Sequence, residues 1–94
     1  MNILNLQFVG PYRVGYLPKL KGIYIVTNGL KWLDVGSSED LSQRVKTSHE
    51  RYAKWLLAGA FLPLKVYCFF GSGPFLLFNE KRLREYLQPL CGER

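Results

Sequence analysis

The sequence predicts a single α+β domain in which helices flank a small antiparallel three-stranded sheet, in the order ββααβα. Two runs rich in β-branched and aromatic residues, 22–27 and 30–35, are followed by helical patterns, a third apolar run over 64–70 and a final helical pattern. A chain of 94 residues that is 48% hydrophobic can bury one modest core but not two. We expect one domain over residues 22–94 after a lead-in segment over 1–21.

The first two runs are joined by Asn28-Gly29, which is a strong hairpin signal. The length of this loop decides whether Tyr24 and Asp34 share a face, because side chains alternate along a strand. A strict two-residue loop places them on opposite faces. An odd-length loop, such as Thr27 to Gly29 with a left-handed Gly29, places both on one face.

The stretch from Ser37 to Leu41 predicts a helix start, with a hydroxyl cap and acidic residues in the first turn. Leu41, Arg44, Val45 and Ser48 then share one face of this helix. Arg44 therefore points inward, where its planar guanidinium suits a phosphate. The alternative is that its stem lies along the core while its head reaches solvent or a carboxylate.

Two more helices are expected, a short one over 52–60 and a final one that begins near residue 75. In the final helix Leu76, Glu80, Leu83 and Leu87 form one stripe, so Glu80 lies on the buried side. A carboxylate in this position needs a compensating cation, either a bound Mg²⁺ or a paired arginine.

A set of motif residues adds functional information to this pattern. The residues are Gly22-Ile23-Tyr24, Asp34-Val35-Gly36, Ser38, Asp40-Leu41, Arg44, and Glu80 nine positions before Pro89. Over residues 22–89 the chain resembles the GIY-YIG nuclease family, and the spacing of the second block matches the catalytic domain of the nucleotide-excision-repair incision subunit. The chain departs from the family where Asp34 replaces the second tyrosine and Gly92 replaces an asparagine.

The resemblance implies a GIY-YIG-like fold, an odd-length hairpin loop and a DNA endonuclease that hydrolyses phosphodiesters with Mg²⁺ or Mn²⁺. In that family Tyr24 would help to deprotonate the attacking water, Arg44 would stabilise charge on the phosphoryl group, and Glu80 would hold the metal. A tyrosine with an ordinary pKa of about 10 acts as a base near neutral pH only beside a cation.

Two further candidate residues have alternative interpretations. Asp34 is either an additional metal ligand close to Glu80 or a sign that catalysis has been lost. His49 follows Arg44 by five residues, whereas the family places a His or Tyr after four, which is Ser48 here. Because one helical residue turns by about 100°, His49 can take that role only if the helix loosens. Otherwise it is a surface or helix-end histidine.

The formal net charge of +6 favours a polyanionic partner, and DNA is the partner that we expect. Lys46, Arg51 and Lys54 are the candidate phosphate-binding residues. A protein partner that supplies specificity is also expected for so small a domain, and no small-molecule cofactor is indicated.

The competing hypothesis is a catalytically silent relative that keeps the fold as a nucleic-acid or protein binding module. Trp32, Tyr67 and Phe69 would then stack on bases, although strand aromatics in a small domain are usually core residues.

Neither Cys68 nor Cys91 has metal-ligand spacing, and we expect both to be reduced thiols. The N-terminus lacks a basic region followed by an apolar stretch, and no apolar run has the length of a membrane span. A cytoplasmic protein without a membrane segment is therefore expected.

Overall fold

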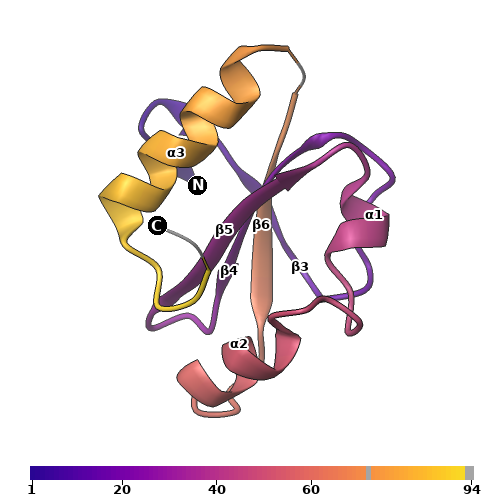
Figure 1. Ribbon diagram of the computed structural model, residues 1–94, viewed down its shortest axis with the longest axis vertical. Coiled ribbons are helices and arrows are strands. Elements are labelled where there is room, and N and C mark those ends of the chain that lie inside the picture. Colours follow the sequence, from indigo (N-terminus) through magenta and orange to yellow (C-terminus); the bar gives the residue numbers. More distant parts are fainter. Residues whose placement is uncertain (72, 93–94) are drawn as a thin grey trace.

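A computed structural model describes residues 1–71 and 73–92 and confirms the α+β class (Figure 1). Its elements are β1 (Asn2–Ile3), β2 (Leu6–Gln7), β3 (Val9–Tyr12), β4 (Gly22–Thr27), β5 (Trp32–Ser38), α1 (Leu41–Arg44), α2 (Tyr52–Ala58), β6 (Lys65–Phe70) and α3 (Phe75–Leu87). Residue 72, in the loop after β6, and residues 93–94, at the end of the expected domain, lie outside the described part. None of the described helices is long and apolar enough to span a membrane.

The main sheet has four antiparallel strands in the order β3-β6-β4-β5, so the expectation of three strands is wrong. The additional strand, β3, belongs to the expected lead-in segment and pairs with β6 at one edge of the sheet. It contains Gly10-Pro11, and both residue types are uncommon in strands. Proline cannot donate a backbone hydrogen bond, but an edge strand tolerates it. A separate two-stranded sheet pairs β1 with β2.

Both faces of the main sheet are covered, as Figure 1 shows for α3 on one side and α1 and α2 on the other. The tyrosine-side core consists of Leu17, Tyr24, Val26, Leu33, Leu41, Val45, Trp55, Val66, Cys68 and Cys91. The α3-side core consists of Ile3, Phe8, Ile23, Ile25, Val35, Leu76 and Leu83. Partly buried Trp32, Tyr67 and Phe69 pack against the α3-side core, which is a structural role for the aromatics considered as base-stacking residues.

The hairpin places Tyr24 and Asp34 on the same face, as expected from an odd offset. Tyr24 pairs with Gly36, and Val26 pairs with Asp34. The loop is not the suggested three-residue one, because Thr27 pairs with Trp32 across a longer loop. The pairing register then shifts between Thr27 and Val26. An additional residue in β5 therefore restores the shared face, as a β-bulge does.

The helix that carries Arg44 is much shorter than expected. It ends at Arg44, and its N-cap is Asp40, whose carboxylate accepts a hydrogen bond from the Ser42 amide at 3.0 Å. The expected hydroxyl cap is therefore wrong, since Ser38 is the last residue of β5. The chain beyond Arg44 forms turns, which is the loosening that His49 requires to face the same side as Arg44.

Candidate active site

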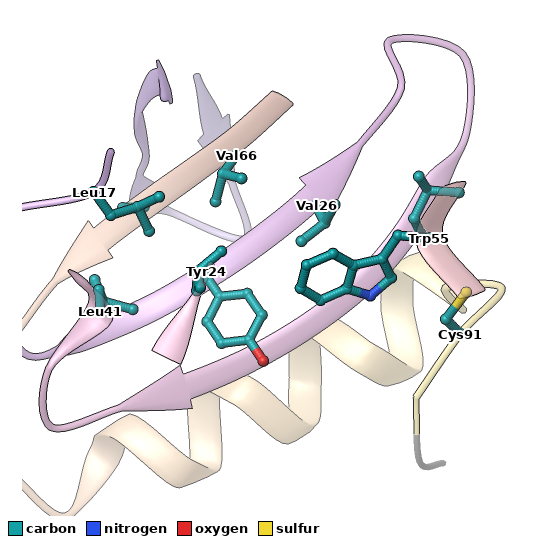
Figure 2. Close-up of a cluster of buried hydrophobic side chains, with 10 residues drawn as sticks. Leu17, Tyr24, Val26, Leu41, Trp55, Val66 and Cys91 are labelled. Carbon is teal, nitrogen blue, oxygen red and sulfur yellow. The ribbon is translucent and has the colours of Figure 1, made fainter. Parts of the chain in front are cut away.

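Tyr24 lies in the middle of β4 with its side chain only 1% exposed, and its ring extends over β5 (Figure 2). The ring covers Gly36. A Cβ at position 36 would lie 2.3 Å from the Tyr24 hydroxyl oxygen, a distance that real contacts do not show. The glycine of the second motif is therefore required by the tyrosine of the first, and the two motifs form one packed unit.

His49 reaches the Tyr24 hydroxyl from the turn between α1 and α2. Its Nε2 lies 3.0 Å from the Tyr24 oxygen, and its Nδ1 accepts a hydrogen bond from the Arg51 amide at 3.0 Å. Because Nδ1 is an acceptor, the neutral ring carries its proton on Nε2 and donates to Tyr24. Burial lowers the pKa of His49, with the nearby Arg44 charge adding to this effect, so the neutral form is favoured.

The Tyr24 hydroxyl is protonated at neutral pH in the free protein. Burial and the Asp34 charge raise its pKa to about 12, while the positive charges of Arg44 and Arg51 oppose the rise. Arg44 is thus placed where its charge acts on the hydroxyl, as the motif predicts. Deprotonation of Tyr24 near neutral pH requires further positive charge at the site.

The guanidinium of Arg44 is held by a carboxylate of the same chain. Its Nη1 and Nη2 donate to the two oxygens of Glu50 at 2.7 and 2.6 Å. This bidentate pair lowers the pKa of Glu50 to about 2. The alternative in which Arg44 reaches a carboxylate is therefore the arrangement of the free protein, and the sequence spacing did not identify Glu50 as that partner.

Asp34 is fully buried, and its carboxylate accepts three hydrogen bonds. Its Oδ2 accepts hydrogen bonds from Arg51 Nε at 2.7 Å and Trp55 Nε1 at 2.8 Å, and its Oδ1 accepts from the Val35 amide at 2.8 Å. The N-cap residue of α2, Arg51, and Trp55 in the middle of the helix are thus anchored to β5. The expectation that Asp34 lies close to Glu80 and shares a metal with it is wrong, because Asp34 faces the Tyr24 side of the sheet and Glu80 packs on the α3 side.

The end of the chain closes over Asp34. The amides of Leu90 and Cys91 donate to the carbonyls of Trp32 and Leu33 at 3.1 and 2.8 Å, which ties this segment to β5. Gly92 has a φ of +91°, and a Cβ there would lie 2.5 Å from Asp34 Oδ1. Gly92 therefore leaves the room that the Asp34 carboxylate occupies, so the two departures from the family pattern fit each other. Sequence spacing alone did not link these two departures.

Glu80 takes its partners on the other face of the sheet. Ser37 Oγ donates to its Oε1, and Arg84 Nη2 lies 2.8 Å from its Oε2. Arg84 Nε also donates to the Val35 carbonyl at 3.0 Å. Glu80 lies on the buried stripe as expected, but it is tied to α3 and β5 rather than to Tyr24 or Arg44. The expected arginine alternative is thus present.

Glu80 is the candidate metal ligand, and it lies on the α3 face of the sheet, apart from the Tyr24 hydroxyl. Among residues 1–71 and 73–92 no three His, Cys, Asp or Glu side chains are grouped as metal ligands. Mg²⁺ nevertheless commonly uses one carboxylate with waters and substrate phosphate oxygens, and ligating carboxylates are usually hydrogen-bonded by neighbours. The Glu80 carboxylate accepts one bond on each oxygen and keeps free lone pairs, so its donor chemistry fits one divalent cation.

The three candidate phosphate-binding residues have different environments. Lys54 is exposed, and the Lys46 ammonium lies 3.1 Å from Gln43 Oε1. Arg51 is only 16% exposed, because its Nε is committed to Asp34. Arg51 is therefore not a free surface residue. Its Nε is bonded to Asp34, and its Nη1 is directed to Glu50. The two cysteines are free and buried, and burial raises the pKa of both thiols.

Comparisons of the chain with models of protein families, with curated proteins and with solved structures found no match. Function is therefore inferred from the residues and their geometry.

A pH titration tests the environment of His49, which is the single histidine of the chain. We expect its pKa to lie below about 6.5, the ordinary value, because burial disfavours the imidazolium. The unfolded state then binds more protons below that pH, so the free energy of unfolding should fall as the pH drops through about 6.5. The Hε1 resonance in NMR reports the pKa. His49→Gln should remove this part of the pH dependence, and a pKa at or above the ordinary value would contradict the buried hydrogen-bonded ring.

Proposed function

We propose that this chain is a GIY-YIG-type endonuclease that hydrolyses DNA phosphodiesters with Mg²⁺ or Mn²⁺. The observation that supports it best is the meeting of Tyr24, Arg44 and His49 around one hydroxyl group. These residues come from β4, the end of α1 and the following turn. A buried tyrosine with an imidazole donor and an arginine beside its oxygen suits the handling of negative charge.

In the proposed reaction the residues of this chain divide the work. Arg44 binds the phosphoryl oxygens through its planar fork and stabilises the charge that develops there. Tyr24 first loses its proton to solvent, and the Nε2 proton of His49 stabilises the resulting phenolate, which then takes the proton of the attacking water. The bond from phosphorus to the leaving oxygen breaks, and the leaving alkoxide takes up a proton from solvent. Arg51 holds His49 in the correct tautomer through its amide, and Asp34 holds Arg51. Asp34 is thus a positioning residue.

Glu80 would hold the divalent cation. When bound, this ion would polarise a phosphate on the α3 face of the sheet, which is the face opposite to Tyr24. Each carboxylate oxygen of Glu80 retains a lone pair for this purpose, as described above.

A silent DNA-binding module is the second candidate, and one observation favours it. Each charged residue that the chemistry would use is already in an ion pair within the protein. Arg44 is paired with Glu50, Asp34 with Arg51, and Glu80 with Arg84. A binding module requires none of these pairs to open for metal.

A cleavage assay separates the two candidates. Single-stranded, double-stranded and branched DNA would be incubated with Mg²⁺ or Mn²⁺ and the wild-type protein. We expect cleavage that fails without the metal. Tyr24→Phe, Arg44→Ala and Glu80→Ala should each lower the rate by about 100-fold or more, because each removes a proton-transfer or charge-stabilising group.

Arg82→Ala is the matched control for the loss of one positive charge. Arg82 is exposed on α3 and stacks over Phe78, away from the site. This variant should cleave at nearly the wild-type rate. Unchanged cleavage in both Arg44→Ala and Glu80→Ala would exclude the proposed mechanism, and DNA binding without any cleavage would support the silent module.

A further inference from the structure

The carboxylate of Glu50 occupies a well-defined position between positively charged groups. Both of its oxygens accept hydrogen bonds from Arg44, and its Oε1 lies 3.5 Å from Arg51 Nη1. Its Oε2 lies 3.6 Å from His49 Nδ1. The carboxylate is therefore next to the two side chains that surround the Tyr24 hydroxyl.

A carboxylate in this geometry has the same bonding pattern as two oxygens of a phosphate. Both groups accept two parallel N–H bonds from one planar guanidinium, which is why arginine recognises both. The Arg51 guanidinium is held in place by its Nε bond to Asp34, which leaves Nη1 directed to Glu50. Arg44 and Arg51 thus form a pre-organised anion-binding pair that Glu50 occupies in the free protein.

We propose that Arg44 and Arg51 form a phosphate-binding site that Glu50 occupies in the free protein, and that a phosphate group of the ligand displaces Glu50 from it. This deepens the proposed function, on which the choice of DNA as the source of the phosphate rests. Glu50 acts as an internal competitor for the anion that lies beside Tyr24.

The occupant is built so that it can leave. The Glu50 side chain is 55% exposed, so its charge returns to water when it swings out. An exposed ion pair contributes little net stability, because solvent screens it and ordering two long side chains costs entropy. Asp34, in contrast, is fully buried with Arg51 and Trp55 and cannot leave without exposing that cluster. Of these two carboxylates, Glu50 is therefore the one that a phosphate can displace.

The test is a binding measurement without divalent metal, so that its result does not depend on catalysis. Glu50→Gln removes the competing charge but keeps the side-chain size. Glu85→Gln, on the exposed surface of α3, makes the same change in net charge elsewhere. Fluorescence anisotropy with a labelled single-stranded oligonucleotide at fixed salt should show tighter binding for Glu50→Gln by about 2- to 5-fold beyond the control. Glu50→Ala should behave in the same way.

A second set of measurements uses inorganic phosphate as the ligand and the Glu50→Gln change combined with Arg44→Ala. Phosphate should shift the Arg44 Nε–H resonance in Glu50→Gln at lower concentration than in the wild type, if the phosphate group alone is recognised. A response to DNA without a response to inorganic phosphate would assign the site to polymer phosphates. The advantage of Glu50→Gln should disappear when Arg44→Ala is added. Equal gains for Glu50→Gln and Glu85→Gln, or a gain that survives Arg44→Ala, would overturn the proposal.

Discussion

Replacing Asp34 by alanine is expected to lower the free energy of unfolding by about 3–5 kcal/mol, which is typical when one partner of a buried ion pair is removed. The change leaves the largely buried Arg51 guanidinium and the Trp55 indole N–H without their acceptor. Since a small domain has a total stability of about 5–15 kcal/mol, this variant should be close to unfolding. Urea denaturation followed by far-UV circular dichroism measures the loss.

Two related variants locate the origin of that loss. Glu39→Ala removes an acid whose side chain is 84% exposed and pairs with Lys21, so it should cost less than about 1 kcal/mol. Asp34→Tyr should destabilise the protein rather than restore a family-like site, because Trp55, Arg51 and Gly92 surround the carboxylate. A cost of under about 1 kcal/mol for Asp34→Ala would contradict the role of the buried pair.

The parts of the site that follow from spacing along one element were predictable. Because side chains alternate along β4 and β5, Tyr24 and Asp34 lie either on the same face of the sheet or on opposite faces. In the structure they lie on the same face. Helical periodicity placed Glu80 on the buried stripe of α3, where it lies. In each case the geometry of a regular element decides the outcome.

The partners of these residues did not follow from the sequence, because they come from other elements. Asp34 meets Arg51, Trp55 and Gly92 only after α2 and the end of the chain have folded onto β5. The short length of α1 is a further example. Asp40 caps it and the helix ends after one turn, which brings His49 to the Tyr24 hydroxyl. Helical periodicity through residue 48 would have excluded that contact.

The strand β3 escaped prediction for a different reason. Gly10 and Pro11 are poor strand formers, and local propensity alone predicts irregular chain there. Their position at the edge of the sheet, next to β6, makes them acceptable. Edge position is a property of the fold and is not encoded in a short window of sequence.

Trp55→Ala is expected to be as damaging as the loss of Asp34, with a cost of about 3–5 kcal/mol. Trp55 is fully buried in the tyrosine-side core, where its ring lies 4.4 Å from that of His49, centroid to centroid. Its truncation creates a cavity beside Tyr24 and removes one donor from Asp34. Trp32→Ala is the matched control. This tryptophan is only partly buried against the α3-side core, so the cost should be smaller.

A double-mutant cycle separates the packing of Trp55 from its hydrogen bond. Trp55→Phe keeps most of the aromatic volume but removes the N–H, and it should cost about 1–3 kcal/mol because the buried Asp34 charge loses a donor. Combined with Asp34→Ala, it should cost less than the sum of the two single changes, since the acceptor is already absent. Because Trp55 also supports the His49 ring, Trp55→Ala should move the pKa of His49 toward its ordinary value as water enters. Additive costs together with an unchanged His49 pKa would mean that Trp55 acts only as a core residue, independent of the Asp34 and His49 network.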